Sequence, residues 1–297
     1  MAMPSTLFQT SDGVRLNVVE RDGDSDLTLV LLHGWVMDHR SWDAVVAELP
    51  AGTRVVRVDF RGHGGSDPAP AGRATINRLA DDIAELLTSK ISGRVVLGAH
   101  SLGAMALMAL AERHPELVTE RVAGVAFVAT TSGGLSRLTF GLPRWLAAPI
   151  LFVEALVNPL IARLPVRRLL GGLSPVAWPL VRFLAFGRKP VRGHVGHVSA
   201  QVGACHPAAM VAFRGELKRH ERRHALSVFL DIPTVVLAGD RDRLCTVAQA
   251  EAIAAELPMA VLEVYPGAGH MLTYERTAEV VAQLSYLMVD MDLEATA

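Results

Sequence analysis

The sequence predicts an α/β fold in which a mostly parallel, eight-stranded sheet is covered by helices on both faces. Short apolar runs alternate with segments of helical periodicity, which is the pattern of repeated strand–helix units. Several of these runs are apolar throughout, as parallel strands buried on both faces require. The chain has 297 residues, of which 51% are hydrophobic, so it can build one large domain with a substantial core.

Eight segments carry strand signals. The first two flank the turn Ser11-Asp12-Gly13 and predict an antiparallel hairpin at one edge of the sheet. The predicted strands are Leu7–Gln9, Val14–Glu20, Leu27–Leu32, Arg54–Val58, Arg94–Gly98, Val122–Val128, Thr234–Ala238 and Val261–Tyr265.

The helices between these strands are marked by capping residues and by apolar faces. We expect Ser41 to be the N-cap of a short helix through Leu49, and Thr75 to be the N-cap of a longer one that begins at Ile76. A proline after His114 ends the helix that follows the fifth strand. The remaining predicted helices are Leu102–Arg113, Val247–Glu256 and Thr277–Val289, with residues 290–297 as a frayed tail.

The strand–helix alternation breaks between residues 133 and 228. This stretch holds eight prolines and no convincing strand, so we expect a helical insertion (133–228) within a body formed by residues 1–132 and 229–297. Leu135–Val228 contains twelve Arg and two Lys against three acidic residues, a net charge of +11. The rest of the chain then carries −12, because the whole chain carries −1. A nearly neutral protein therefore combines a basic insertion with an acidic body.

Composition excludes several classes of function. A net charge of −1 argues against a dedicated nucleic-acid binder. The two cysteines, Cys205 and Cys245, cannot form a disulfide scaffold, and neither belongs to a CxxC pair. His194, His197 and the Cys205-His206 pair lack a further ligand at useful spacing, so we expect no metal and no other cofactor.

No segment has the character of a membrane span or an export signal. The longest charge-free stretches, Val95–Ala111 and Val122–Ser136, are shorter than the ~20 apolar residues that a spanning helix needs. Met1–Asn17 has no basic patch followed by an apolar stretch. The expected location is therefore the cytoplasm.

A serine lies at the junction of a predicted strand and a predicted helix, within Gly98-Ala99-His100-Ser101-Leu102-Gly103. This context is the one that a nucleophile elbow requires, with a strained turn that holds the Ser101 hydroxyl outward. Residues two positions away must be small, because strand and helix approach closely there. Gly103 meets this requirement, and Ala99 is the smallest substitute for the usual glycine.

A base and an orienting acid follow in the chain. His270 lies in a glycine-rich loop after the last predicted strand, where it can reach the carboxyl edge of the sheet. Asp242 follows the strand Thr234–Ala238 with one turn between them, and Asp240 is the alternative acid. The order Ser101, Asp242, His270 matches a nucleophile, acid and base triad.

An acyl-transfer site also needs two donors for the oxyanion. One predicted donor is the backbone N–H of Leu102, the residue after the nucleophile. The other is the backbone N–H of Trp35, in the His33-Gly34-Trp35 loop after strand Leu27–Leu32.

Taken together, these features resemble the α/β-hydrolase superfamily, in particular its serine esterases and lipases. The resemblance covers residues 5–132 and 229–289. Asp59-Phe60-Arg61-Gly62-His63-Gly64-Gly65-Ser66 also resembles the D-x-R-G-x-G-x-S loop of the family, which we interpret as scaffold. The sequence departs from the family pattern at Ala99, where glycine is usual, and in the insertion. Relatives that resemble epoxide hydrolases and haloalkane dehalogenases carry Asp at the position of Ser101, and are therefore disfavoured.

In this family an insertion at residues 133–228 forms a helical cap that supplies the substrate pocket. The resemblance thus implies a carboxylic ester with an apolar acyl or alcohol part, cleaved through an acyl-enzyme without a cofactor. The apolar cap residues are expected either to line the cleft or, for about half of them, to pack the cap against the body. They are Trp145, Leu146, Ile150, Leu151, Phe152, Leu156, Leu160, Trp178, Phe183, Leu184 and Phe186.

Other functions stay open at this point. The same triad can act on a lactone, a thioester, a C–C bond or peroxide, or can transfer an acyl group to an alcohol. A binding module that retains the triad with little turnover is a further alternative. The basic cap, including Arg167, Arg168 and Arg182, can contact anionic lipid, attract a soluble anion, or pair with the acidic body. The oligomeric state is not indicated.

Overall fold

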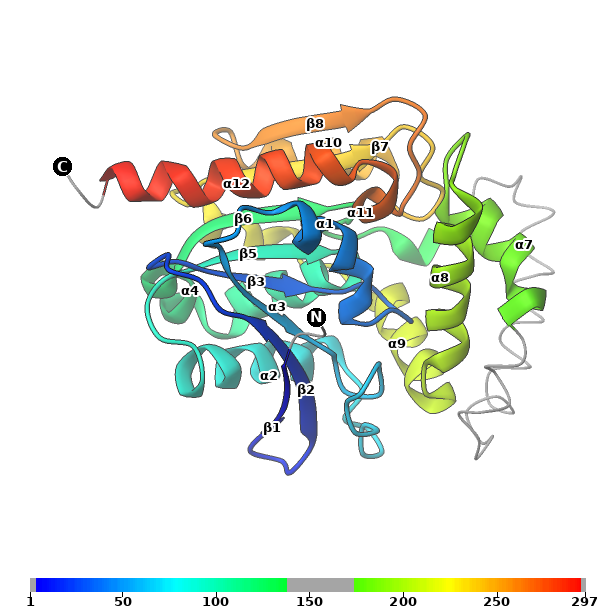
Figure 1. Cartoon of the computed structure of the whole chain (residues 1–297), viewed down its shortest axis with the longest axis horizontal. Coiled ribbons are helices and arrows are strands. Elements are labelled where there is room, and N and C mark those ends of the chain that lie inside the picture. The colour runs from blue at the N-terminus through cyan, green and yellow to red at the C-terminus, as the bar shows by residue number, and fades with distance from the viewer. Residues whose placement is uncertain (1–3, 138–173, 295–297) are drawn as a thin grey trace.

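The computed structural model describes residues 4–137 and 174–294. Its centre is an eight-stranded sheet in the order β1-β2-β4-β3-β5-β6-β7-β8 (Figure 1). Strand β2 is antiparallel to β1 and to β4, and every other neighbouring pair is parallel. The predicted mostly parallel sheet with an antiparallel edge is therefore confirmed.

All eight strands lie where the apolar runs predict them, within two residues at each end. Their bounds are β1 Ser5–Gln9, β2 Arg15–Arg21, β3 Thr28–Leu32, β4 Arg54–Val58, β5 Val95–His100, β6 Val122–Val128, β7 Thr234–Gly239 and β8 Val261–Tyr265.

Strand β3 shows why these runs are apolar throughout. Leu29 and Leu31 belong to the core on one face of the sheet, whereas Val30 and Leu32 belong to the core on the other face. Successive side chains of a strand point to opposite faces, so a strand covered on both sides has no position for a polar residue. Figure 1 shows α12 and α1 on one face, with α2 and α3 on the other.

The helices follow the predicted order, with three differences. Asp38 and not Ser41 caps the first helical turn, because its carboxylate accepts a hydrogen bond from the Arg40 amide at 3.0 Å. Two short helices, α4 and α11, were not predicted, and α12 continues into the predicted tail. The helices of the body are α1 Asp43–Glu48, α2 Ile76–Ser89, α3 Leu102–Arg113, α4 Pro115–Arg121, α10 Val247–Glu256, α11 Leu272–Glu275 and α12 Thr277–Glu294.

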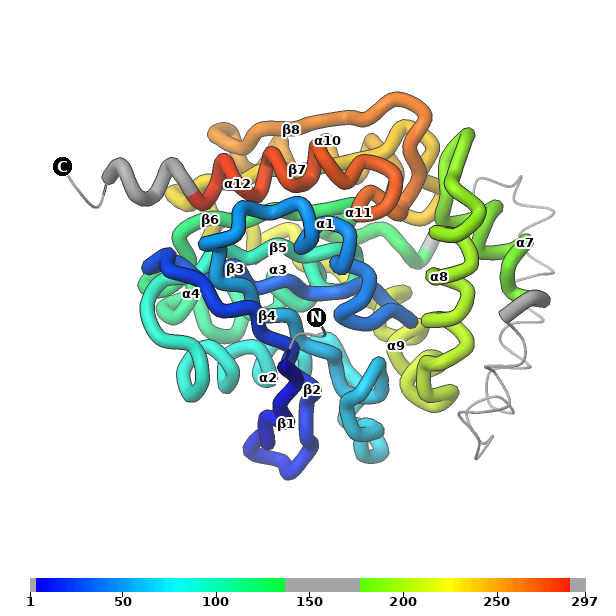
Figure 2. The backbone as a smooth tube through the Cα atoms, viewed as in Figure 1, coloured from blue at the N-terminus to red at the C-terminus, as the bar shows by residue number. Residues whose placement is uncertain are grey.

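The described part of the insertion, residues 133–137 and 174–228, is helical and contains no strand. Figures 1 and 2 show α7 (Ser174–Ala185), α8 (Arg192–Ala204) and α9 (Pro207–Arg219) beyond the carboxyl ends of the parallel strands. Helix α9 packs into the main core, whereas α7 and α8 form a smaller core with loops of the body. The cap boundaries at residues 133 and 228 stay a prediction.

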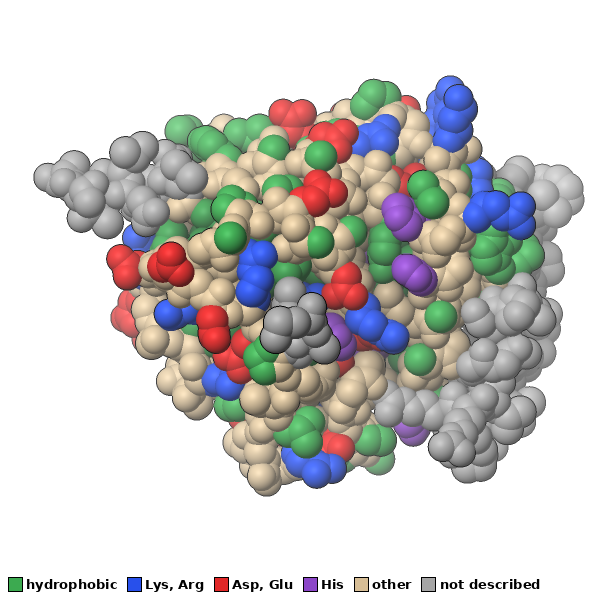
Figure 3. All heavy atoms as spheres, viewed as in Figure 1, with side chains coloured by type: hydrophobic (Ala, Val, Ile, Leu, Met, Phe, Trp, Pro, Cys, Tyr) green, Lys and Arg blue, Asp and Glu red, His purple; other side chains and the backbone are tan. Residues whose placement is uncertain are grey.

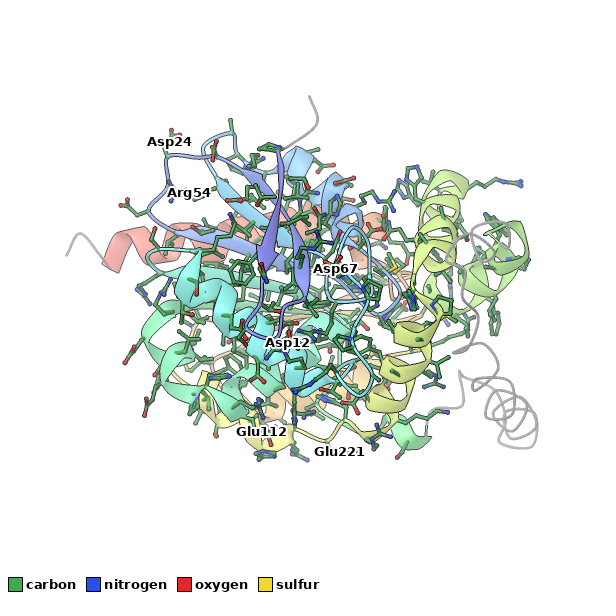
Figure 4. The ribbon with its side chains drawn as sticks, turned by 90° about the horizontal axis from the view of Figure 1, so that it is seen from below. Asp12, Asp24, Arg54, Asp67, Glu112 and Glu221 are labelled. Carbon is green, nitrogen blue, oxygen red and sulfur yellow. The ribbon has the colours of Figure 1, made fainter. Side chains whose placement is uncertain are left out.

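Part of the basic insertion pairs with the acidic body. Arg222 Nε lies 2.8 Å from Glu112 Oε2, and Arg223 also pairs with a body glutamate, Glu256. The Gly134 amide donates to Glu221 Oε1 at 2.7 Å and so joins two segments that lie close to the ends of the insertion. Glu112 and Glu221 lie on the same side of the molecule (Figure 4).

Two of the three cap arginines considered above, Arg167 and Arg168, lie outside the described residues, and Arg182 donates to the Arg188 carbonyl at 3.1 Å. Figure 3 shows basic side chains beside hydrophobic ones over α7 and α8. Among the helices of the described ranges, none combines the length and the apolar character needed to cross a bilayer.

Candidate active site

Ser101 occupies a strained turn between β5 and α3. Its φ of 52° and ψ of −112° lie in a region that residues other than glycine rarely adopt. Neighbouring groups hold it there: the Ser101 amide donates to the Val128 carbonyl at 2.9 Å, and Thr130 Oγ1 donates to the Ser101 carbonyl at 3.0 Å. The strain is therefore maintained by the surrounding sheet, as expected for a turn that presents a reactive group.

The close approach of strand and helix explains the small residues around Ser101. A Cβ atom at Gly103 would lie 2.7 Å from the carbonyl oxygen of Leu32 and 2.9 Å from that of His33. Ala99, which stands where the family usually has glycine, is fully buried in the same core. The turn therefore accommodates one methyl group on the strand side but has no room for one on the helix side.

Replacing Gly103 by Ala should lower the free energy of unfolding by about 1–3 kcal/mol, because backbone oxygens cannot move away from the new methyl group. Gly193→Ala in α8 is the matched control, since its Cβ would meet nothing within 4 Å and alanine favours helices. Urea denaturation measures both. Equal stability of the two variants would contradict the tight turn.

The structure brings His270 and Asp242 together at the carboxyl edge of the sheet. His270 Nδ1 lies 2.7 Å from Asp242 Oδ2, and both residues are buried. The second oxygen, Asp242 Oδ1, accepts the amides of Leu244 at 2.7 Å and Cys245 at 2.9 Å. These bonds fix the carboxylate that holds Nδ1, while Nε2 of the imidazole makes no hydrogen bond in the part of the chain that the structure describes.

Asp240, the alternative acid, has a different partner. Its Oδ1 accepts the Gly267 amide at 2.6 Å, so it anchors the far end of the His270 loop.

Burial raises the pKa of the Cys245 thiol well above its usual value, and the Asp242 charge adds to this effect. The thiol beside the acid is therefore protonated and unreactive at neutral pH.

His100 is a site residue that sequence reasoning did not single out. Its Nε2 donates to the His270 carbonyl oxygen at 2.9 Å, and the two rings lie 4.8 Å apart between centroids. Burial lowers the pKa of His100 to about 3, with His270 as a further cause, so the ring is neutral. Its position immediately before Ser101, at the last residue of β5, is the signal that could have identified it.

The two predicted oxyanion donors come from different elements near Ser101: Leu102 follows it in the chain, and Trp35 lines the same cavity. Leu102 is the first residue of α3, so no carbonyl of its own helix can accept from its amide. Trp35 lies in the loop after β3, and its indole Nε1 donates to the Met210 carbonyl at 3.0 Å. Val36 follows with a φ of 57°, unusual for a β-branched residue, so this loop is held under strain as well.

Ser101, His270 and the Trp35 loop open into one cavity of about 580 Å³. The Ser101 hydroxyl makes no hydrogen bond within the described residues, and such contacts commonly tighten only when a substrate is bound. Most of the described lining is apolar and comes from α7, α8 and α9 together with the loops of the body. The aliphatic and aromatic cap residues of this lining are Leu135, Leu180, Val181, Phe183, Leu184, Ala185, Val198, Val202, Met210, Val211 and Leu217.

Two of the cap residues predicted to line the cleft, Phe183 and Leu184, do so. Phe186 is buried in the core between cap and body, and Trp178 packs against that core, as the alternative packing role predicts. The other seven, Trp145, Leu146, Ile150, Leu151, Phe152, Leu156 and Leu160, lie outside the described residues.

One cluster of potential metal ligands exists in the described ranges: Asp38, His39 and Asp59. Its oxygens are already occupied. The Arg40 guanidinium binds both oxygens of Asp38, while Asp59 accepts the amides of His39 at 2.6 Å and Gly65 at 2.8 Å. Burial opposes the charge of Asp59, but the hydrogen bonds and charge of His39 hold its pKa below the usual value. We therefore interpret the cluster as a structural network.

His33 also belongs to the scaffold. Its Nδ1 lies 2.7 Å from the Gly34 carbonyl, and its Nε2 accepts the Phe60 amide at 2.9 Å. Burial lowers the pKa of His33, which agrees with a neutral ring that donates from Nδ1. It links the Trp35 loop to the Asp59–Ser66 loop.

Comparison with known proteins gives the same fold. The structure superposes on a thermophilic esterase from Thermogutta terrifontis with a TM-score of 0.74 and 22% identity. The superposition covers 97% of this chain and 99% of that one. An enol-lactonase from Burkholderia xenovorans LB400 has a TM-score of 0.76 at 20% identity, with 96% of this chain and all of that one covered. At these identities the likeness concerns the fold.

Sequence comparison is more specific. A pimeloyl-[acyl-carrier protein] methyl ester esterase from Aromatoleum aromaticum is 31% identical over 250 residues, which cover 82% of this chain and 90% of the relative. Epoxide hydrolase A from Mycobacterium tuberculosis is 26% identical and aligns over 99% of this chain and the whole relative. Residues 29–284 match the profile of the alpha/beta hydrolase family. The eight-stranded sheet, the strained serine turn and these matches together establish that the chain belongs to the alpha/beta hydrolase family.

Proposed function

We propose that this hydrolase cleaves carboxylic esters with an apolar acyl or alcohol part through an acyl-enzyme. The observation that carries the proposal is the meeting of Ser101 and the Asp242–His270 pair at one predominantly apolar cavity. Methyl ester esterases among the relatives support ester hydrolysis at this kind of site.

In the proposed mechanism Ser101 Oγ attacks the ester carbonyl while His270 Nε2 takes its proton. Asp242 holds Nδ1–H, which fixes the tautomer and stabilises the imidazolium. The amides of Leu102 and Trp35 bind the oxyanion, and losing one such donor typically costs about 3–4 kcal/mol of transition-state stabilisation. His270 then protonates the leaving alcohol and activates the water that releases the acid. No cofactor takes part.

The nucleophile argues against epoxide opening, despite the epoxide hydrolase among the relatives. A hydroxyl at position 101 gives a carboxylic acyl-enzyme, whose carbonyl water can attack. Serine attack on an epoxide carbon would leave an ether, which offers water no such carbonyl. The lactonase among the structural neighbours shares the fold, and a lactone is an internal ester open to the same chemistry.

Hydrolysis of p-nitrophenyl esters from acetate to palmitate tests the function and measures the pocket. We expect turnover, with a preference for acyl chains longer than acetate, because the cavity of about 580 Å³ has an apolar lining. Val202→Trp, on the cavity wall in α8, should lower kcat/KM for the longest accepted esters about tenfold or more while acetate changes little.

Val191→Trp is the matched control, since Val191 lies at the start of α8, is 60% exposed and is not part of the cavity lining. It should leave the chain-length profile unchanged. A wild-type enzyme without turnover on any of these esters would contradict the proposed function. An unchanged profile in Val202→Trp would contradict the assignment of the cavity as the acyl site.

A further inference from the structure

The loop that carries His270 is joined to the cap through the backbone. The amides of His270 and Met271 both donate to the Ala185 carbonyl, at 2.9 and 3.1 Å. In the opposite direction, the Arg188 amide donates to the Gly267 carbonyl at 2.9 Å. The end of α7 and the His270 loop are thus hydrogen-bonded side by side.

Glu275, the last residue of α11, lies between these two segments. Its Oε2 accepts the Gly187 amide of the cap at 2.8 Å, and its Oε1 accepts the Gly269 amide of the loop at 2.9 Å. A Cβ atom at Gly269 would lie 2.5 Å from the Gly187 nitrogen, so the two backbones meet with no room for a side chain. One carboxylate therefore satisfies a buried donor from each side of the junction.

The surroundings of the Glu275 carboxylate favour hydrogen bonds to these two amides over contact with solvent. Burial raises its pKa, and the Asp242 charge adds to that, whereas the two amide donors and Arg276 favour the ionised form. A carboxylate that accepts backbone amides makes charge-assisted hydrogen bonds, which are roughly twice as strong as neutral ones.

We propose that Glu275 is a positioning residue for catalysis, which holds the backbone of His270 and the base of the cap as one unit. The proposal rests on the proposed function of His270 as the base. Gly267 and Gly269 give the loop no side chains to fix its path, so its geometry depends on external hydrogen bonds. Releasing Gly269 would let the imidazole shift relative to Ser101, and a displacement of about 1 Å can cost roughly 100-fold in rate.

Glu275→Gln is the decisive variant, because the amide keeps one oxygen acceptor but turns an NH2 toward the other backbone donor. We expect kcat on the best ester to fall about 10- to 100-fold with KM within about twofold. The far-downfield proton resonance of the His270–Asp242 hydrogen bond should shift or broaden in the same variant.

Glu216→Gln is the matched control. Glu216 lies on α9 and accepts the Ile76 amide of the body at 3.0 Å, so it also ties cap to body, but away from His270. It should retain the wild-type kcat and the wild-type resonance. A Glu275→Gln enzyme that loses only thermal stability and otherwise matches Glu216→Gln would overturn the proposal.

The proton resonance of the His270–Asp242 hydrogen bond tests the positioning role independently of ester hydrolysis. It is observable without turnover, so a wild-type protein inactive on esters would refute ester hydrolysis and leave the positioning role testable. Amide hydrogen exchange in the wild type covers the case in which the variant does not fold. The amides of Gly187, Gly269 and His270 should then be protected to the same degree, and free exchange at Gly187 or Gly269 would overturn the proposal.

Discussion

Replacing Ser101 by Ala is expected to lower kcat for ester hydrolysis by about 10⁵- to 10⁶-fold, the effect typical of losing the nucleophile of a serine triad. In the proposed mechanism the hydroxyl forms the acyl-enzyme, and the rest of the turn does not depend on it. The bonds from Ser101 to Val128 and Thr130 involve only its backbone, so the fold should persist.

Stopped assays over long times measure the residual rate of the variant. A parallel sample treated with inhibitor, in which any active enzyme is blocked, gives the background rate. Binding of a non-hydrolysable ester analogue is the control and should stay within about threefold of wild type, because the apolar lining is unchanged. Residual turnover above one-hundredth of wild type would show that another group is the nucleophile.

Replacing Asp242 by Asn should lower kcat by about 10⁴-fold, as seen when a triad acid loses its charge and imposes the wrong tautomer. Oδ1 must continue to accept the amides of Leu244 and Cys245, so the new NH2 group takes the place of Oδ2. It would then donate to His270 Nδ1, which leaves the proton on Nε2 and removes the acceptor that Ser101 needs.

Asp240→Asn is the control, because it removes the same charge two residues away in the same loop. Asp240 binds the Gly267 amide and not the imidazole, so its replacement should change kcat by less than about tenfold. Steady-state kinetics of both variants on one ester provide the comparison. The reverse order of effects would assign the orienting acid to Asp240.

Much of the body could be predicted from local patterns. Strands β4, β6 and β8 and helices α3 and α10 have the bounds that the apolar runs and helical periodicity predict. Their bounds could be predicted because buried strands are apolar throughout and because proline or glycine often lies near the ends of such elements. Ser41 is not the cap because the first helical turn, His39–Trp42, begins before it and places Ser41 inside the turn, with Asp38 as its cap.

The site could be predicted in its outline but not in its supports. Ser101, Asp242 and His270 follow β5, β7 and β8, which are neighbours or near neighbours in the sheet, so their order and spacing predict that they lie at one edge. Their catalytic roles stay a prediction. His100 and Glu275 act through contacts with residues 170 positions and 88 positions away, which no local pattern encodes. The close contact of Gly187 with Gly269 is likewise a product of the packed cap.

The central claim is that Ser101 is the group that reacts with substrate, and covalent labelling tests it most directly. The folded protein is treated with a long-chain fluorophosphonate, and its intact mass and peptide masses are measured. We predict one adduct per chain on the peptide that contains Ser101, slowed by a competing ester and absent in Ser101→Ala. An unlabelled wild-type protein, or an adduct that persists in Ser101→Ala, would contradict the account.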